Sequence, residues 1–280
     1  MKVTTSYYFE IEDEDGIKKY GKSKEHRPNP IVQMGMFMDG DGIPLAFSLF
    51  PGNANEQTSI KPLEEKILNE FDCQKFIYCS DAGLGSEKIR KYNHMGERAF
   101  VVTQSIKKLN AQDRQWALDT KGFKRLSDDK VVDLAEISKD DGMYAISTDL
   151  LDDNVSEILS ISEKRWQIEE CFRIMKTEFE ARPVYLQRVD RITAHFLTCF
   201  LALIIYRYLE KALEHKYTCE EILKTLKDFN FAYVKEQGFI PLYKRTELTD
   251  KLHEICHFNT DFEFITKSQM RTIKKQSKGK

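Results

Sequence analysis

The sequence predicts an α/β fold: a mixed sheet flanked by helices, followed by a helical C-terminal region. Short segments rich in β-branched and aromatic residues, separated by turn residues, fill the first third of the chain. The second half instead carries long apolar patterns with the helical period. The 280 residues are 41% hydrophobic and 31% charged. This composition is typical of a globular protein that can bury one large core or two modest ones.

Three consecutive strands are predicted at the start of the chain. Residues 4–11 are rich in β-branched and aromatic side chains, and residues 31–38 and 43–50 have the same character. The last two segments flank Asp39-Gly40-Asp41-Gly42, a sequence that favours a tight hairpin turn. We therefore expect an antiparallel hairpin that pairs with the first strand.

A helix and a fourth strand should follow. Residues 60–71 are amphipathic, and residues 75–80 form a short apolar strand that ends at Asp81. Residues 87–94 are then predicted to be helical and residues 99–103 to form another strand. Three strands, a helix and a fourth strand that delivers an acid are the order expected of a ribonuclease-H-like core.

The same patterns divide the chain into four regions. Residues 1–103 form the first part of the core, and residues 104–160 are a more polar insertion with its clearest strand at 143–147. Residues 161–216 form the second part of the core, and residues 217–280 form a helical region. That region ends in a basic tail, which either is solvated or makes additional contacts with DNA. The basic residues of the tail are Lys267, Arg271, Lys274, Lys275, Lys278 and Lys280.

Composition also bounds the function. A net charge of −2 and a pI near 6.4 argue against a protein that coats DNA, although local charge can override the total. The apolar run 196–206 is too short to span a bilayer, so we expect a buried helix and no membrane. The N-terminus lacks a secretory pattern, and the six cysteines lack CxxC or disulfide-like spacing, which indicates a reducing cytoplasm.

The segment 165–176 is the most informative part of the sequence. At 100° per residue, four of its ionic side chains fall within an arc of roughly 80°. The members of this arc are Arg165, Glu169, Arg173 and Lys176. A separate core-facing stripe is predicted for Ile168, Cys171, Phe172, Met175 and Phe179.

One acid among three cations suits phosphodiester chemistry. A carboxylate can hold a divalent cation while neighbouring basic groups bind phosphates. The alternative is an ordinary ion-paired surface helix in which Glu169 and Arg173 form an i,i+4 pair. A weaker candidate is a zinc site on one helical face at His253, Cys256 and His257, for which no fourth ligand is evident.

The spacing of Arg165, Glu169 and Lys176 matches the signature YxxRxxxExxxxxxK, with Ser162 in place of the tyrosine. On this signature the chain resembles the DDE transposases of bacterial insertion sequences. Residues 26–56, 75–86 and 98–109 also resemble blocks of that family, in the family's order. The resemblance therefore covers most of residues 20–215.

The resemblance implies a ribonuclease-H-like fold with a β-rich insertion before the glutamate. It implies that Asp81 and Glu169 bind metal, with Glu169 selected over Glu170 by the signature spacing, although Asp81 by itself also fits a capping residue. Two Mg²⁺ or Mn²⁺ ions are expected in an intact site, where they support hydrolysis at transposon ends and strand transfer. Arg165, Arg173 and Lys176 would then hold the phosphates of double-stranded DNA, from both the transposon ends and the target.

The family's first acid has no counterpart here. The resemblance places it at Val3, or at Lys2 if the alignment slips by one, and neither residue is acidic. Glu10 and Glu12 lie at the far end of the strand, roughly 20 Å away. The family's N-terminal region that recognises transposon ends is also missing, so we expect a truncated transposase that is inactive alone.

Two alternatives remain open. The first is a noncatalytic DNA-binding or subunit-pairing remnant that inhibits full-length transposase through mixed complexes. Such a remnant pairs either with a second copy, as a homodimer, or with full-length transposase. The second is a ribonuclease-H-like nuclease with another substrate, which would need a replacement acid.

Overall fold

The computed structural model describes residues 2–22, 28–55, 61–70, 76–80, 86–96, 98–117, 124, 130 and 145–277. The chain divides into two compact units, Met1–Phe200 and Leu201–Lys280. The predicted mixed α/β fold with flanking helices and a largely helical C-terminal region is confirmed. The predicted region boundaries at 103, 160 and 216 stay predictions, because much of the expected insertion lies outside the described residues.

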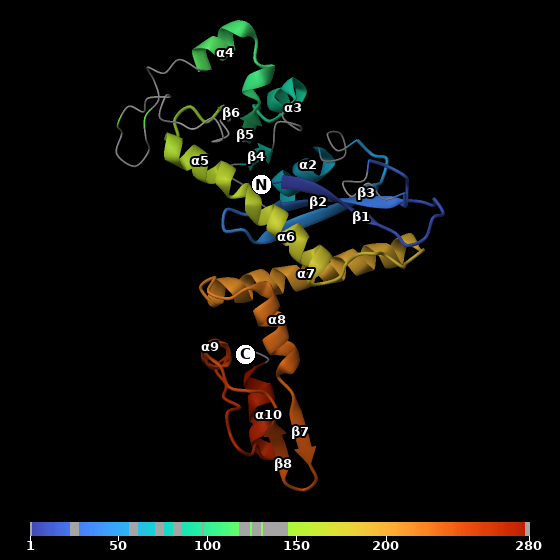
Figure 1. Ribbon diagram of the computed structural model, residues 1–280, viewed down its shortest axis with the longest axis vertical. Helices are drawn as coiled ribbons and strands as arrows, with labels where there is room; N and C mark the ends of the chain where they lie inside the picture. The colour runs from blue at the N-terminus through green and yellow to red at the C-terminus, as the bar shows by residue number, and fades with distance from the viewer. Residues whose placement is uncertain are drawn as a thin grey trace. The chain divides into compact units, whose positions relative to one another are not determined.

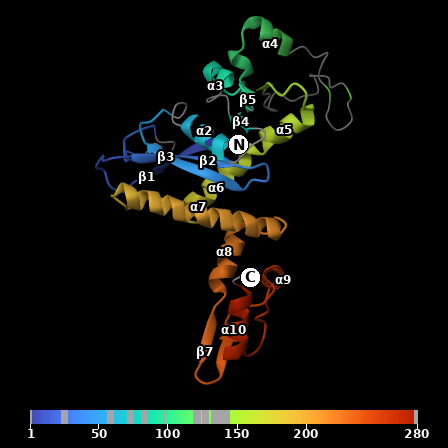
Figure 2. The ribbon, with the colours of Figure 1, turned by 180° about the vertical axis from the view of Figure 1, so that it is seen from behind.

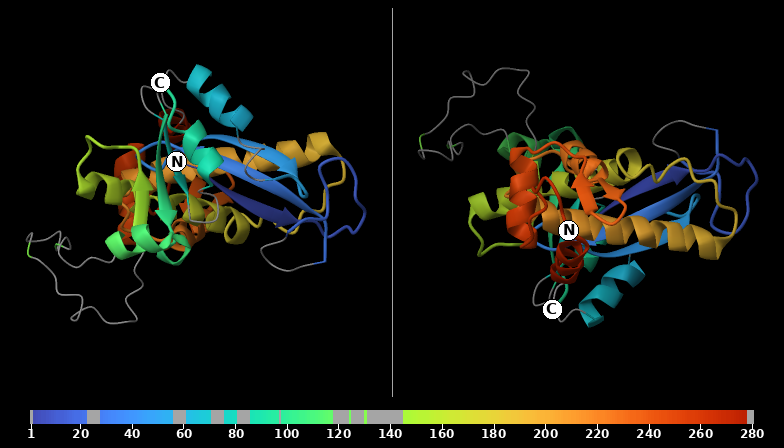
Figure 3. Two further views of the ribbon diagram at one scale, coloured as in Figure 1. Left: turned by 90° about the horizontal axis from the view of Figure 1, so that it is seen from above. Right: turned by 90° about the horizontal axis from the view of Figure 1, so that it is seen from below.

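The first sheet is antiparallel, with the order β1 (Lys2–Tyr8), β2 (Ile31–Met38) and β3 (Pro44–Pro51). Figure 3 shows the three strands side by side from above. Every residue of β2 is buried, because β1 and β3 flank the strand and other elements cover both faces of the sheet. Strand β1 ends at Tyr8 and not at residue 11, since its partner β2 begins at Ile31, directly opposite Tyr8.

The turn between β2 and β3 confirms the hairpin predicted from the sequence. The Asp39 carboxylate accepts hydrogen bonds from the backbone N–H groups of Asp41, at 2.9 Å, and Ile43, at 2.8 Å. Gly42 has φ +80°, a conformation that glycine adopts without steric cost. The local chemistry of this turn therefore sets the register of the hairpin.

A second sheet contains β4 (Phe76–Ser80), β5 (Arg98–Gln104) and β6 (Ala145–Thr148). Strand β4 pairs with β5 in parallel, and β5 pairs with β6 in an antiparallel ladder. Strand β1 lies beside β4, so the two sheets adjoin. The connections carry α2 (Lys61–Glu70), α3 (Glu87–Tyr92), η1 (Ile106–Lys108) and α4 (Ala111–Ala117).

Helices cover the sheets on both sides. On one side Phe37, Tyr78 and Phe100 form a core cluster with Ile89 of α3, and Leu68 of α2 packs against it. On the other side, the strand residues Cys79 and Val101 pack against Ile158 and Ile161. These two isoleucines belong to α5 (Val155–Glu163), which leads directly into α6 (Arg165–Thr177). Helix α6 crosses in front of β1 and β2 in Figure 1, and the strands lie in front of it when seen from behind in Figure 2.

Helix α7 (Val189–Ala212) contains the apolar run 196–206, for which the sequence predicts a helix. Its length and composition would also suit a membrane span. In the first unit, however, its Phe196 ring lies 4.8 Å from the Tyr7 ring, and its Phe200 ring lies 4.8 Å from the Phe47 ring. This part of α7 therefore packs one face against the first sheet, as a core helix does.

The second unit combines helices with a hairpin that the sequence did not predict. Its helices agree with the helical region predicted for residues 217–280, whereas β7 and β8 are strands within that region. The elements are α8 (Cys219–Asp228), β7 (Phe231–Val234), β8 (Gly238–Pro241), α9 (Glu247–Cys256) and α10 (Lys267–Gln276). Helices α8, α9 and α10 each begin with a threonine capping box.

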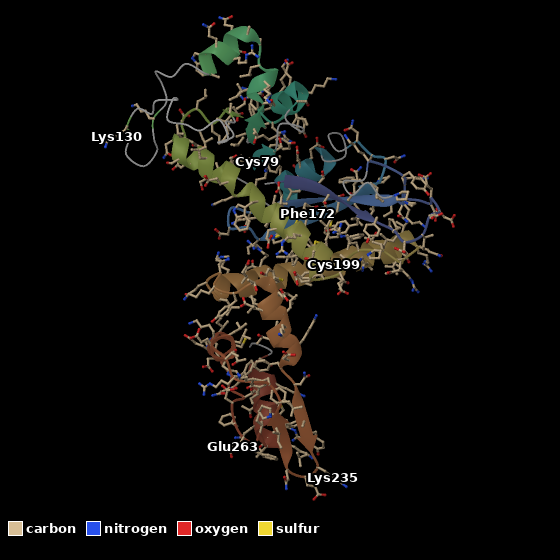
Figure 4. The ribbon with its side chains drawn as sticks, viewed as in Figure 1. Cys79, Lys130, Phe172, Cys199, Lys235 and Glu263 are labelled. Atoms are coloured by element: carbon tan, nitrogen blue, oxygen red, sulfur yellow. The ribbon has the colours of Figure 1, made fainter. Side chains whose placement is uncertain are left out.

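A long-range backbone pairing holds the hairpin in place. Phe239 and Ile265 exchange two N–H to carbonyl hydrogen bonds of 2.8 Å. Gly238 has φ +138°, and a Cβ atom there would lie 2.2 Å from the carbonyl oxygen of Ile265. Only glycine fits this position. Lys235 lies at the tip of the hairpin (Figure 4).

Candidate active site on helix α6

Helix α6 is positioned by the end of α5. Asn154 caps α5, accepting a hydrogen bond of 2.9 Å from the backbone N–H of Glu157, whose side chain accepts one from the Asn154 N–H. Lys164 is both the last cap of α5 and the first cap of α6, so the two helices follow each other without a loop. The start of α6 is therefore fixed by the packing of α5 on the second sheet.

The buried face of α6 matches the predicted stripe. Figure 4 places Phe172 on this helix. The Met175 sulfur accepts a 3.7 Å hydrogen bond from the Tyr7 hydroxyl, while Phe179, beyond the helix end, is half-buried. The buried residues of the helix are Ile168, Cys171, Phe172, Ile174 and Met175.

Glu169 lies on the opposite, solvent-facing side. Its side chain is 57% exposed, and one carboxylate oxygen lies 3.5 Å from Nε of Arg165, one helical turn earlier. Trp166 is 59% exposed and, by helical spacing, shares this side with Glu169 and Arg173. An exposed ion pair contributes little to stability, so this carboxylate is open to a ligand at small cost to the fold.

Arg173 is paired with carboxylates of its own helix end. Its Nε and Nη2 atoms donate to the two Glu170 oxygens at 2.8 and 2.7 Å, and Nη1 lies 3.7 Å from Glu178. The sequence alternative of a Glu169–Arg173 surface pair is thus replaced by two other pairs, Arg165–Glu169 and Arg173–Glu170.

Lys176 points to the first sheet. Its ammonium donates a 2.7 Å hydrogen bond to the Thr5 hydroxyl and lies 5.3 Å from the centre of the Tyr7 ring. Both partners belong to β1, so Lys176 ties the end of α6 to the opening strand. The four ionic side chains of the predicted arc therefore divide into the loose Arg165–Glu169 pair and two side chains held by shorter bonds to protein groups.

Helix α6 and strand β1 run in the same direction. After α6 the chain returns beside the end of β1, where Val184 donates to the Tyr8 carbonyl at 3.0 Å and accepts from the Glu10 N–H at 3.2 Å. The seven residues from Lys176 back to Glu169 span about 10 Å of helix. About three strand residues cover the same length. Counted back along β1 from Thr5, that length reaches positions 2 and 3.

The end of β4 approaches the start of α6. Burial raises the pKa of the Cys79 thiol, and the positive charge of Arg165 partly offsets that rise. The Cys79 thiol also donates a 3.8 Å hydrogen bond to the carbonyl of Ile161, on α5. The end of β4 therefore lies close to the end of α5, which leads into α6. Asp81 itself lies outside the described residues.

The described residues do not make a two-ion site. Mg²⁺ and Mn²⁺ require several oxygen ligands, and catalytic ion pairs are bridged by carboxylates. Of the expected acids, the described part of the chain contains Glu169, while positions 2 and 3 of β1 carry lysine and valine. The described residues alone therefore cannot hold the ion pair that DNA cleavage requires.

A second group of ligand-type side chains lies in the C-terminal unit. One ligand atom each from Asp250, His253 and Asp261 lies within 4.8 Å of the others. No sequence pattern indicates these three residues as a group, because they come from α9 and from the segment after it. Cys256 is exposed and His257 caps α9 in a left-handed conformation, so the group gathered around His253 differs from the predicted zinc triplet.

Protein groups already satisfy this second group. His253 Nδ1 lies 3.2 Å from Asp261, and Nε2 lies 2.9 Å from the Thr260 hydroxyl. The guanidinium of Arg245 donates to Asp250 at 2.7 Å and lies 3.6 Å from Asp261. Arg245 thus supplies the positive charge that a metal ion would bring, and the arrangement is that of a hydrogen-bonded network.

Comparison with known proteins adds a family. The family described as a transposase DDE domain matches residues 3–205. Among solved structures, the chain resembles the piggyBac transposase in a synaptic complex with hairpin DNA, at a TM-score of 0.46 and 10% sequence identity. The alignment covers 96% of this chain and 59% of that chain, so this chain spans little more than half of that transposase chain. No curated protein matched.

Proposed function

The chain belongs to the transposase DDE domain family, and from that premise we propose that it is the catalytic-domain part of an insertion-sequence transposase. The observation that carries the proposal is the position of Glu169. This carboxylate is exposed on α6 beside Arg165, and the same helix is tied to β1 by the bond from Lys176 to Thr5. In the proposed role Glu169 is a metal ligand, Asp81 is a second one, and Arg165 holds a DNA phosphate.

The insertion-sequence branch is proposed from the spacing of Arg165, Glu169 and Lys176. Two of these residues share the exposed side of α6, where a duplex can reach them. Lys176 bonds to Thr5, so we propose that it positions α6 against β1; its contact with DNA stays a prediction. A DNA contact by Arg173 would require exchange of its bonds to Glu170.

We further propose that the isolated chain does not cleave DNA. The resemblance assigns the first of the three acids to position 3 or 2 of β1, and these positions carry valine and lysine, so the site would lack that acid. The same observation favours a second candidate function, a noncatalytic subunit that binds double-stranded DNA and inhibits an intact transposase by pairing with it. Mg²⁺ or Mn²⁺ as the ions, homodimer formation and a cytoplasmic location belong to the same proposal.

Restoring the acid tests this proposal. In β1 alternate residues occupy opposite faces, so position 3 has the parity of Thr5 and Tyr7, whose side chains contact α6. Position 2 has the opposite parity. We expect that Val3→Asp creates Mn²⁺-dependent nicking of supercoiled DNA and that Lys2→Asp, the matched control, does not.

The restored activity must depend on the glutamate. Val3→Asp combined with Glu169→Gln is expected to nick no faster than the unmodified chain. Glu169-dependent nicking by the unmodified chain would show that the first acid is dispensable and would refute the proposed inactivity. Nicking by Val3→Asp that survives Glu169→Gln would refute the assignment of the site.

A further inference from the structure

The C-terminal unit contains a pocket that the candidate active site does not use. Its volume is about 390 Å³, within the usual range for ligand sites. Four phenylalanines dominate its wall, and polar groups lie among them. The lining residues are Phe229, Phe231, Phe239 and Phe258, with Asn230, Thr260, Met270, Ile273, Lys274 and Ser277.

The aromatic wall is held rigidly from behind. The Phe229 ring stacks on the Tyr243 ring, with centroids 4.1 Å apart and planes 15° apart. The Tyr243 hydroxyl donates to Asp261 at 2.7 Å and lies 2.6 Å from the Thr260 hydroxyl, which the His253 ring also contacts. Because these partners fix Tyr243, the Phe229 ring is presented to the pocket in one orientation.

The mouth of the pocket is polar and basic. Asn230, Lys274 and Ser277 are exposed among the lining residues. Helix α10 carries Lys267, Arg271, Lys274 and Lys275 and no acidic residue. The pocket therefore suits a ligand that has a flat aromatic group, which lies inside the pocket, and an anionic group, which binds Lys274 at the mouth.

We propose that this pocket binds an unpaired nucleobase of a DNA strand, with an adjacent phosphate at Lys274. Bases stack on aromatic side chains irrespective of sequence, and lysine neutralises the backbone next to them. The choice of DNA rests on the proposed function, because the chain belongs to a family of DNA transposases. The pocket lies wholly within residues 229–277, so it can be tested apart from α6.

The test compares two single-stranded oligonucleotides, one intact and one with a single abasic site, by fluorescence anisotropy with the full chain. We expect the intact strand to bind at least about fivefold more tightly, from the stacking of one base. We expect Phe231→Leu to abolish that difference, with thermal melting as the check that the unit stays folded. Equal affinities for the two strands in the unmodified chain would overturn the proposal.

Two neighbouring lysines supply a matched control. Lys274 lines the pocket, whereas Lys275 is exposed on the same helix outside the lining. We expect Lys274→Gln to weaken binding several-fold and Lys275→Gln to weaken it less than about twofold. Equal losses would mean that the basic helix attracts DNA without a pocket and would contradict the proposal.

A variant of α6 separates this inference from the proposed function. Arg165→Gln is expected to leave the intact-versus-abasic difference unchanged, because Arg165 belongs to the other unit. If DNA binding at α6 fails while that difference persists, the proposed function falls and the nucleobase pocket stands. If the difference is absent while α6 binds duplex DNA, the pocket proposal falls and the proposed function stands.

Discussion

Helix α6 and the Asp250/His253/Asp261 network use similar side chains in opposite settings. On α6 the Glu169 carboxylate is 57% exposed and has one weak ion-pair partner. In the network, His253 and Asp261 side chains are 8% and 12% exposed and bond to several groups. Ionic groups that are buried and satisfied hold a fold together, whereas exposed, loosely paired ones can change partners. Residue types alone would favour the network as a metal site. The exposed face of α6 is better suited to bind a ligand, because its carboxylate is loosely paired.

The largest predicted effect is on the network. Asp261→Ala leaves Tyr243, His253 and Arg245 without a shared acceptor, so we expect the free energy of unfolding to fall by about 3 kcal/mol. Asp250→Ala is the matched control, since Asp250 is 45% exposed and bonds to Arg245 at the surface. It should cost less than about 1 kcal/mol. Urea unfolding measures both, and equal losses would mean that Asp261 is not the centre of the network.

Tyr243→Phe should have a smaller effect that depends on pH. The variant loses the hydroxyl bonds to Thr260 and Asp261, and we expect a cost of about 1–2 kcal/mol at neutral pH. Burial, the largest cause, raises the pKa of Tyr243 from 10.0 to about 12. The fold therefore favours the protonated phenol, and this contribution is complete below pH 10 and is lost as the pH rises towards 12.

Unfolding of the parent chain and of Tyr243→Phe across that range checks the sign. The stability difference between the two should shrink between about pH 10 and pH 12, since the variant has no phenol to titrate there. A difference that stays constant or grows would contradict the assigned burial of the phenol.

The link between α6 and β1 should have an intermediate effect. Lys176→Met keeps the apolar stem but removes the bond to Thr5, and we expect a loss of about 1 kcal/mol. Thr5→Val removes the other partner at nearly constant volume. A double-mutant cycle of the two measures their coupling, and a coupling near zero would show that Lys176 is not tied to β1.

The smallest effect on stability is predicted for the candidate site itself. Glu169→Gln removes one exposed ion pair, so the free energy of unfolding should change by no more than about 0.5 kcal/mol. Urea unfolding under the conditions used for Asp261→Ala makes the contrast direct. A loss as large as that of Asp261→Ala would show that Glu169 is a structural residue.

Local sequence signals predicted much of the fold. The β2–β3 hairpin follows from the turn at Asp39–Gly42, whose hydrogen bonds are made within a few residues. The buried face of α6 follows from helical spacing. The β7–β8 hairpin was missed because its strands are only four residues long and depend on the pairing of Phe239 with the distant Ile265.

The candidate site could be predicted only in part. Helical spacing placed Arg165 and Glu169 on one side correctly, but it carries no information on partners from other elements. Lys176 bonds to Thr5, which lies 171 positions away in the chain. Asp81 was assigned as a metal ligand from the family resemblance of residues 75–86, and that prediction stays untested by the described residues. No spacing rule joins Tyr243, His253 and Asp261, because tertiary packing brings them together.

The most direct test of DNA binding by the exposed face of α6 uses its tryptophan. The chain has two tryptophans, Trp116 and Trp166, so Trp116→Phe leaves Trp166 as the only indole emitter. We predict that duplex DNA changes Trp166 fluorescence in a saturable, salt-sensitive manner and that Arg165→Gln weakens the apparent affinity several-fold. Duplex binding, seen by anisotropy, that leaves Trp166 emission unchanged and is indifferent to Arg165→Gln would contradict the account.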